Sequence, residues 1–228
     1  MIDGHELLAA EGCFPMVPWA GRIRDGRLTV DGVTHQLPLS SDGNAIHGLG
    51  RNAEWQLVGA DTFRCVIGSP WPTQGVAELH YELLPDGLRI TLTWQDGSDL
   101  PCSIGLHPWF KRRLDAGHDV VMRLEAEAMV ERGVDGLPTG QLTDPTAGPW
   151  DDCFRIDGSL TLTWPSALTL TLASSAQWWV VFDERADTVC AEPQTAPPDA
   201  FDHPVLQPVG PWDRSVWFEL RASRASTH

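Results

Sequence analysis

Two ionisable side chains follow β-patterned runs of this sequence. His107 lies in segment 105–110 and Glu192 in segment 190–195. A proline follows each of them and biases it toward extended backbone, so both are expected at strand ends. An imidazole can give or take a proton at neutral pH, and a carboxylate at a buried strand end must be paired, metal-bound or used. The pair is a candidate acid and base facing one substrate. A backbone-bonded histidine and an ion-paired glutamate are the structural alternatives.

Three further residues carry polar groups suited to a small polyhydroxylated ligand. His47 stands next to Gly48 in a loop where backbone can approach a ligand closely. Arg22 offers a planar head with five donors. Asp151 lies between aromatic residues and is either an acceptor for hydroxyl groups or a turn former. Eleven tryptophans supply flat apolar surfaces, which suit sugar rings, although most are expected in the core. These features favour carbohydrate chemistry.

The composition limits the partners and the compartment. The chain has 228 residues, a formal charge of −15 and a pI near 4.7, which disfavour nucleic acid and anionic membrane surfaces as partners. Five scattered cysteines contain no Cys-x-x-Cys pair and fit a reducing cytoplasm. The first six residues lack the features of a signal peptide, and no run approaches the roughly 20 apolar residues of a membrane span. A cytoplasmic location is expected.

Hydrophobic alternation and turn signals predict an all-β fold. Asp-Gly occurs eight times, from positions 3–4 to 157–158, and this pair favours tight hairpin turns. Period-two alternation is clearest at 27–30, 88–94, 160–164 and 168–172. Further strands are predicted at 55–58, 63–67, 76–84, 102–106, 120–126, 178–183, 188–191 and 215–221. Only segment 125–132 has some helical character. The expectation is one domain over residues 1–228, an antiparallel sandwich or barrel.

Five sequence blocks in a fixed order resemble the aldose 1-epimerase (galactose mutarotase) family. The blocks are 18–26, 46–48, 105–110, 150–154 and 192–201. The resemblance implies an antiparallel β-supersandwich with a monosaccharide substrate in an open cleft. It implies that His107 is the general acid for the ring oxygen and Glu192 the general base for the C1 hydroxyl. By the same resemblance Arg22, His47 and Asp151 hold the sugar oxygens, and no metal or nucleotide cofactor is needed.

Two departures from the family pattern bear on assembly and substrate. Family members usually have additional N-terminal strands, so the resemblance implies a shortened N-terminus, either genuine or because the chain is a fragment. The loss would expose a sheet edge that a homodimer would cover. Trp109 and Lys111-Arg112 follow His107 where galactose mutarotases more often carry tyrosine and asparagine. The preferred sugar therefore stays open.

Three other functions remain as alternatives. A hexose-6-phosphate 1-epimerase would need a basic cluster, for which the candidates are Arg22, Arg24, Arg27, Lys111, Arg112 and Arg113. A non-catalytic sugar-binding module would not require both His107 and Glu192. A cupin-like metal enzyme would use His47, His80, His107 and His118, but these lack the close His-x-His spacing of such sites.

Overall fold

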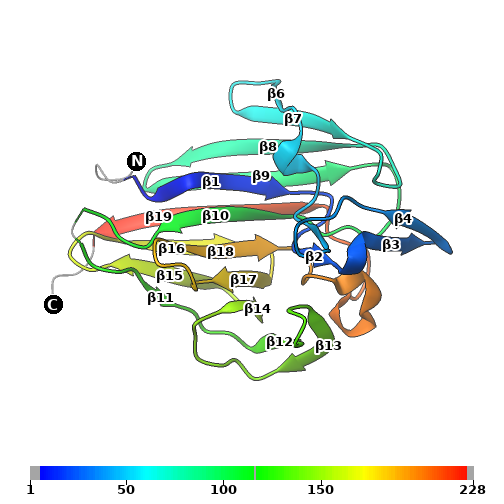
Figure 1. The fold of residues 1–228 in the computed structure, drawn as a ribbon. Helices are drawn as coiled ribbons and strands as arrows, with labels where there is room; N and C mark the ends of the chain where they lie inside the picture. The colour runs from blue at the N-terminus through cyan, green and yellow to red at the C-terminus, as the bar shows by residue number, and fades with distance from the viewer. Residues whose placement is uncertain (1–5, 116, 225–228) are drawn as a thin grey trace.

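Two antiparallel sheets stacked face to face form most of the molecule (Figure 1). The structure is a computed structural model and describes residues 6–115 and 117–224. The first sheet has seven strands in the order β1-β10-β18-β17-β14-β12-β13. Their bounds are β1 Leu8–Met16, β10 Gly105–Lys111, β18 Thr188–Gln194, β17 Trp178–Phe182, β14 Asp151–Arg155, β12 Ala128–Arg132 and β13 Pro138–Thr143.

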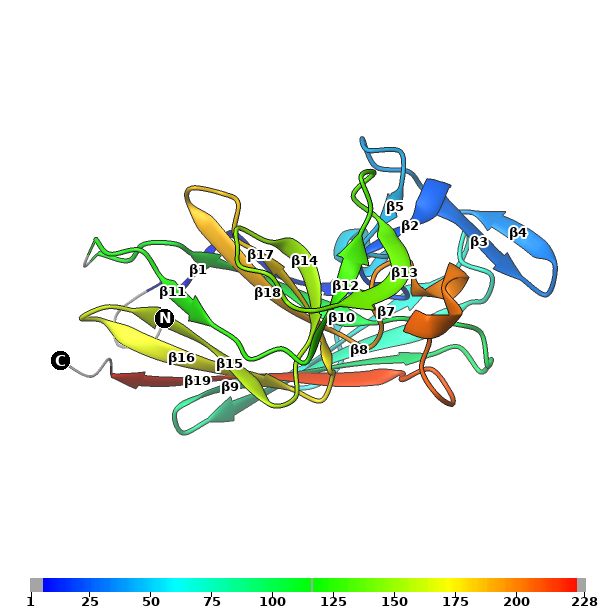
Figure 2. The same cartoon turned by 90° about the horizontal axis from the view of Figure 1, so that it is seen from below.

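The second sheet has eight strands in the order β11-β15-β16-β19-β9-β8-β7-β6. Their bounds are β11 Val121–Arg123, β15 Ser159–Trp164, β16 Leu168–Ser174, β19 Ser215–Arg224, β9 Gly87–Gln95, β8 Gly75–Leu84, β7 Thr62–Ile67 and β6 Gln56–Leu57. Two small ribbons stand at one end of the sandwich, as Figure 2 shows. They pair β2 Arg22–Ile23 with β5 Ala45–Ile46, and β3 Arg27–Val30 with β4 Val33–Gln36.

The core lies between the two sheets and follows from period-two alternation. In β15 and β16 the leucines are buried while the threonines are half-buried on the opposite face. Trp179 of the first sheet meets Phe218 of the second, with ring centroids 6.1 Å apart. The inward faces of both sheets are therefore apolar, and each sheet has a second face available for polar groups.

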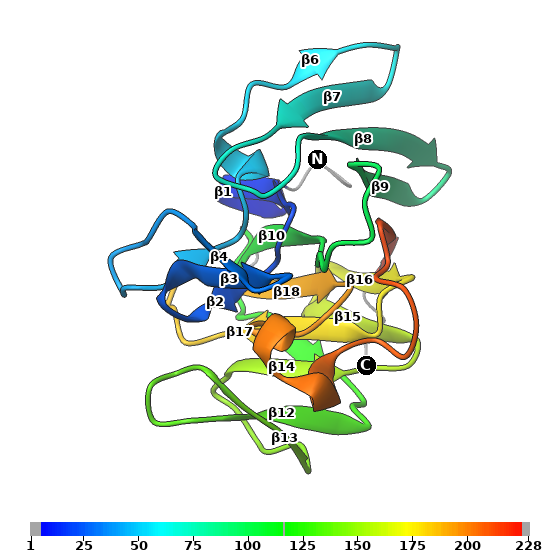
Figure 3. The ribbon, with the colours of Figure 1, turned by 90° about the vertical axis from the view of Figure 1, so that its right-hand side faces the viewer.

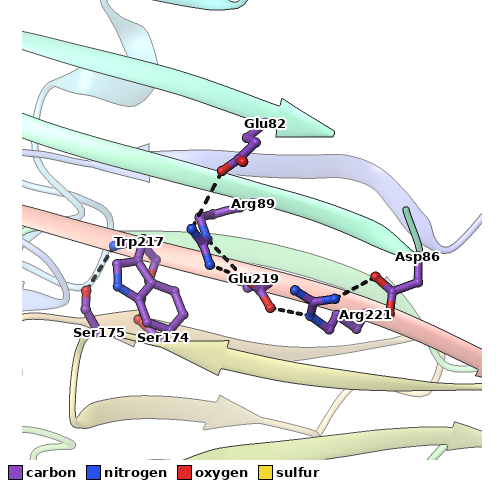
Figure 4. Close-up of polar contacts among 8 residues, drawn as sticks. All are labelled: Glu82, Asp86, Arg89, Ser174, Ser175, Trp217, Glu219 and Arg221. Atoms are coloured by element: carbon purple, nitrogen blue, oxygen red, sulfur yellow. Dashed lines mark hydrogen bonds and ion pairs between the residues drawn. The ribbon is translucent and has the colours of Figure 1, made fainter. Parts of the chain in front are cut away.

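The second face of the eight-stranded sheet carries an ion-pair network (Figure 4). Arg89 of β9 binds Glu219 of β19 at 2.6 Å, and Arg221 binds Asp86 at 2.7 Å. The Arg89 guanidinium also lies over the Trp217 ring, 5.2 Å from its centroid. Opposite charges on neighbouring strands satisfy one another here.

Four short 3-10 turns connect strands in the described chain, near the end that carries the small ribbons. They are η1 Arg24–Gly26, η2 Gly50–Asn52, η3 Ala200–Asp202 and η4 Pro204–Leu206. Figure 3 shows the η3 and η4 segment between the β2 side and the β12–β13 side of the molecule. No helix within the described ranges has the length and apolar character needed to span a membrane.

The predicted antiparallel all-β class is confirmed, with local corrections. Segment 125–132 is not helical, because it contains β12, which pairs with strands on both sides. Of the strand predicted at 102–106 only residues 105 and 106 are in a strand, β10, which runs on past Pro108; β18 likewise runs past Pro193. His107 and Glu192 therefore lie within strands rather than at strand ends. The Asp-Gly turn at 3–4 lies outside the described residues.

β10 and β18 continue past their prolines because each is paired with a neighbouring strand on both sides. The pairs Gly105–Gln194 and Trp109–Cys190 keep one register on either side of the two prolines. A proline removes one ladder hydrogen bond, but the flanking pairs hold the strand straight. Asp151, expected in a loop, begins β14.

Candidate active site

Strand register brings His107 and Glu192 together. Because Gly105 pairs with Gln194 and Trp109 with Cys190, His107 stands directly opposite Glu192. Directly opposed residues of antiparallel strands point to the same face of a sheet. The row that contains the pair continues across the seven-stranded sheet as Phe14, His107, Glu192, Val180 and Cys153. The row beside it is Trp109, Cys190, Phe182 and Asp151.

Apart from Phe14 and Cys190, the members of these two rows form the floor of a cleft on the face of the sheet that points away from the core. One wall contains Gly21, Arg22, Ile46 and His47, and the other comes from the β12–β13 hairpin at 136–138. All five residues predicted for the site line this one cleft: Arg22, His47, His107, Asp151 and Glu192. Residues from segments far apart in the sequence thus meet around a single floor.

The His107–Glu192 pair is close and almost entirely buried. Nε2 of His107 lies 3.2 Å from Oε1 of Glu192, and their side chains are 6% and 3% exposed. Nδ1 of His107 and Oε2 of Glu192 are buried without a hydrogen-bond partner in the protein. Buried polar atoms are normally satisfied, and both of these atoms belong to side chains that line the cleft.

Burial shifts the two groups in opposite directions on the pH scale. It lowers the pKa of His107 well below its usual range, and neighbouring His47 and Arg51 lower it further. Burial also raises the pKa of Glu192 well above its usual range; Asp151 adds to this rise and Arg22 opposes it. Both charged forms are therefore disfavoured, which makes the imidazolium a better proton donor and the carboxylate a better acceptor than in water.

His47 is held beside the pair by its backbone. Its φ of 58° lies in the left-handed region, and its N–H donates to the carbonyl of Gly21 at 2.9 Å. Its ring meets the His107 ring edge-on, with centroids 4.8 Å apart. Burial, with the charges of Arg22 and Arg51, lowers the pKa of His47 to about 3. A neutral imidazole at this place can donate one hydrogen bond and accept another.

Arg22 and Asp42 form an ion pair at the rim. Nε of Arg22 binds Oδ2 of Asp42 at 2.7 Å, while Ser40 donates to the same carboxylate. Burial acts to raise the pKa of Asp42, but the bonds from Arg22 and Ser40 hold it below its usual range. The bond at Nε fixes the guanidinium and leaves its other donors available to a ligand.

On the other side of the floor, Arg132 of β12 forms ion pairs with two carboxylates. It lies 3.4 Å from Asp151 and 3.2 Å from Asp152. Arg132 is a cleft residue that sequence reasoning missed, because its strand was predicted as partly helical. Burial raises the pKa of Asp152, with Arg132 opposing the rise.

Aromatic and aliphatic side chains make the remaining floor. The Trp109 ring stacks on His107 at 5.1 Å, tilted by 14°, and the guanidinium of Arg185 lies 4.9 Å from Trp109. Phe182, Val180 and Val130 also line the cleft and were not predicted as site residues. The alternation of segment 178–183 could have indicated Val180 and Phe182 as one face, but not which face meets a ligand.

One group of residues is arranged so that it could hold a metal ion. His47, His107 and Glu192 each offer one ligand atom, and these atoms lie within 4.8 Å of one another. The cupin-like alternative is not supported, because His80 instead lies on β8 of the other sheet, 3.3 Å from Asp61. Two imidazoles and a carboxylate suit zinc and also suit proton transfer, so the geometry allows both.

The basic residues expected to bind a phosphate do not come together. Of the six, only Arg22 lines the cleft. Lys111 binds Glu6, Arg113 binds Asp119, and Arg112 donates to carbonyl groups of Asp183 and Arg185. Lys111 follows His107 and Trp109 on the same face of β10, but it does not line the cleft.

The chain was compared with known proteins. The aldose 1-epimerase family model matches residues 4–205. Protein YihR of Escherichia coli (strain K12) is 24% identical over 82% of this chain and 70% of its own length. A galactose mutarotase-like protein from Clostridium acetobutylicum has a TM-score of 0.78 at 17% identity, covering 94% of this chain and 80% of its own. The GalM/aldose epimerase homologue from C. elegans has a TM-score of 0.77 at 15% identity, covering 93% and 82%. The chain belongs to the aldose 1-epimerase family.

Proposed function

We propose that this protein is an aldose 1-epimerase that interconverts the α and β anomers of an aldohexose. His107 donates a proton to the ring oxygen while Glu192 takes the proton from the C1 hydroxyl. The C1–O5 bond breaks, the electron pair stays on the ring oxygen, and C1 becomes an aldehyde. Rotation about C1–C2 and reversal of both proton transfers close the ring with the opposite configuration.

The observation that carries this proposal is the 3.2 Å approach of His107 Nε2 to Glu192 Oε1 on the cleft floor. The reaction needs a proton donor for the ring oxygen and a proton acceptor for the C1 hydroxyl of the same sugar. The imidazole of His107 and the carboxyl group of Glu192, on adjacent strands, supply both groups. Positioned acids and bases are each worth about 10²- to 10⁴-fold in rate. Two such groups suffice for a reaction that already proceeds slowly in water.

The surrounding side chains fit a neutral sugar. Arg22, His47 and Asp151 present donors and acceptors around the pair, and Trp109 and Phe182 offer apolar surface to ring carbons. In this assignment Arg22, His47 and Asp151 bind the sugar oxygens. Arg22 and His47 lie on one wall and Asp151 lies on the floor, which allows contact with several oxygens of one sugar.

The alternative of a phosphorylated substrate has less support. The arginines in the cleft are Arg22 and Arg132, and both are paired with aspartates. Four carboxylates line the same cleft: Glu131, Asp151, Asp152 and Glu192. A phosphate dianion would meet net negative charge there. A non-catalytic binding module is disfavoured as well, because binding alone does not require two buried groups with opposed pKa shifts.

Polarimetry of freshly dissolved α-D-glucose and α-D-galactose tests the proposal. The protein should accelerate mutarotation of at least one sugar, and E192Q should not. E127Q is a matched control, since Glu127 forms an ion pair with Arg155 outside the cleft. Equal rates with and without protein for both sugars, together with acceleration of glucose 6-phosphate, would favour the phosphorylated substrate. No acceleration with any of the three, but measurable sugar binding, would favour the binding module.

A further inference from the structure

Asp199 is a buried carboxylate just outside the cleft, in the loop that follows β18. Its side chain is 1% exposed. Its φ of 56° lies in the left-handed region, which is unusual for a residue other than glycine. A buried charge held in an unfavourable backbone conformation needs compensating contacts. Two of those contacts are with the backbone of the segment that carries Arg22.

Asp199 binds the Arg22 segment at two points of its backbone. Its N–H donates to the carbonyl of Arg22 at 2.8 Å. Its Oδ1 accepts the N–H of Arg24, also at 2.8 Å. The two bonds bracket Ile23, whose side chain is in the core. The main chain that carries Arg22 is thus fixed from outside the β2–β5 ribbon.

A close approach of two backbones reinforces this attachment. A Cβ atom on Gly21 would lie 2.7 Å from side-chain atoms of Pro198, so only glycine fits there. The carbonyl of the same Gly21 accepts the N–H of His47. The loop therefore supports both residues of this wall, Arg22 directly and His47 through Gly21.

The other end of the loop is attached to the strand that carries Glu192. Thr195 donates its N–H to the carbonyl of Ile104 at 2.8 Å, and its hydroxyl oxygen accepts the N–H of Ile104 at 2.9 Å. These bonds fix the loop three residues beyond Glu192. Eight residues of the chain therefore link Glu192 to Asp199. Hydrogen bonds hold this segment to Ile104 at Thr195 and to Arg22 at Asp199.

The second oxygen of Asp199 lies between two basic side chains. Oδ2 is 3.5 Å from Nε of Arg24 and 3.5 Å from Nε2 of His203. The His203 ring also lies against Gly140 of β13, where a Cβ would be 2.6 Å from Nδ1. Arg24 in turn binds Asp135 of the β12–β13 hairpin at 2.6 Å. Asp199 thus contacts the segment of one wall directly and is linked to the β12–β13 wall through Arg24 and His203.

We propose that Asp199 is a positioning residue that holds Arg22 at a fixed place relative to Glu192 and thereby sets the affinity for the sugar. The inference rests on the proposed function, in which Arg22 binds the sugar. Asp42 holds the Arg22 guanidinium, whereas Asp199 holds its main chain. Without the Asp199 carboxylate the ion pair with Asp42 and the backbone bond from residue 199 to Arg22 remain, but the segment loses its bond at the Arg24 N–H and can shift there. A displacement of about 1 Å in a positioning group is enough to weaken productive binding substantially.

Two substitutions separate the carboxylate from the backbone strain. D199N keeps an oxygen that accepts the Arg24 N–H, and asparagine tolerates the left-handed region. D199G removes the oxygen but accepts the same φ without strain. We expect D199G to raise the KM for the preferred sugar roughly tenfold with kcat within about twofold, and D199N to stay near wild type. D31G is the matched control, because Asp31 has a φ of 48° and is exposed in the β3–β4 turn.

A double-mutant cycle with R22M decides whether the effect passes through Arg22. If it does, D199G adds little to the KM of the R22M protein. An equal rise in KM in both backgrounds, or a fall in kcat alone, would overturn the inference. Calorimetric titration with the sugar gives the Kd independently of turnover, and thermal unfolding verifies that each variant is folded. If R22M itself leaves KM and Kd unchanged, the binding role of Arg22 fails and the inference fails with it. That result differs from one in which R22M raises KM but D199G raises it equally in both backgrounds. The second result would refute only the link between Asp199 and Arg22.

Discussion

His107 and Glu192 stand opposite each other on adjacent antiparallel strands, with Nε2 and Oε1 3.2 Å apart. Strand register sets this relationship, because directly opposed residues of antiparallel strands point to the same face of the sheet. The acid and base of the proposed reaction are therefore part of the rigid sheet rather than of a mobile loop. A site built on strands is held more precisely than one built on loops.

Removing either group should abolish most turnover. H107N and E192Q should each lower kcat by about 10²- to 10⁴-fold, because each removes one proton-transfer partner. KM should change much less. Polarimetry with the preferred sugar measures both constants. The matched controls are H35N on β4 and E127Q beside Arg155, and circular dichroism verifies folding. A wild-type kcat in H107N or E192Q would refute the assigned role of that residue.

The acid limb of the pH profile should depend on Asp151. Glu192 acts as a base only when ionised, so kcat/KM should fall as the pH drops through its raised pKa. Burial is the main cause of that raised pKa, and the Asp151 charge adds to it. D151N should therefore lower the pKa of Glu192 and move the acid limb to lower pH. D144N, outside the cleft, should leave the limb in place. A limb that moves to higher pH in D151N would contradict this electrostatic assignment.

Glu192 should also reduce the stability of the fold at neutral pH. Its pKa is raised in the folded state, so the unfolded chain loses the proton first as pH rises. Stability then declines from about pH 4 upward, relative to a protein without this carboxylate. E192Q should unfold at a higher temperature than wild type at pH 7, with a smaller difference at pH 4. A gain of about 1 kcal/mol corresponds to roughly 2–4 °C at this chain length. A difference that shrinks as pH rises would contradict the sign.

Removal of metal tests the expectation of a cofactor-free reaction. His47, His107 and Glu192 are close enough together to bind one cation. If they transfer protons and bind sugar instead, exhaustive dialysis against EDTA should leave kcat/KM unchanged. Addition of Zn²⁺ to the dialysed protein should not increase the rate. A loss of activity on dialysis that a divalent metal restores would replace the proposed mechanism with a metal-assisted one.

Much of the site could be predicted from sequence because its residues lie in short blocks with special backbone requirements. The His-Pro and Glu-Pro pairs marked His107 and Glu192, and the Asp-Gly turns and alternating strands gave the all-β class. The predictions failed where local pattern was weak. β12 has no clear period of two, so Arg132 was missed, although its partner Asp151 was predicted. Pro108 and Pro193 predict strand ends, but paired strands on both sides allow β10 and β18 to continue past them.

Gly48 should be essential for placing His47. Its φ is 72°, and a Cβ there would collide with the backbone of Val17, whose carbonyl accepts the N–H groups of Leu49 and Gly50. Gly97 is the matched control, since its φ of 67° is similar but nothing lies near its Cβ position. G97A should cost about 1 kcal/mol from backbone strain alone. G48A should cost several times as much and should also raise KM, because the turn that carries His47 must move. Equal destabilisation of the two variants in urea unfolding would show that the backbone around Val17 yields, and that His47 is not fixed by this contact.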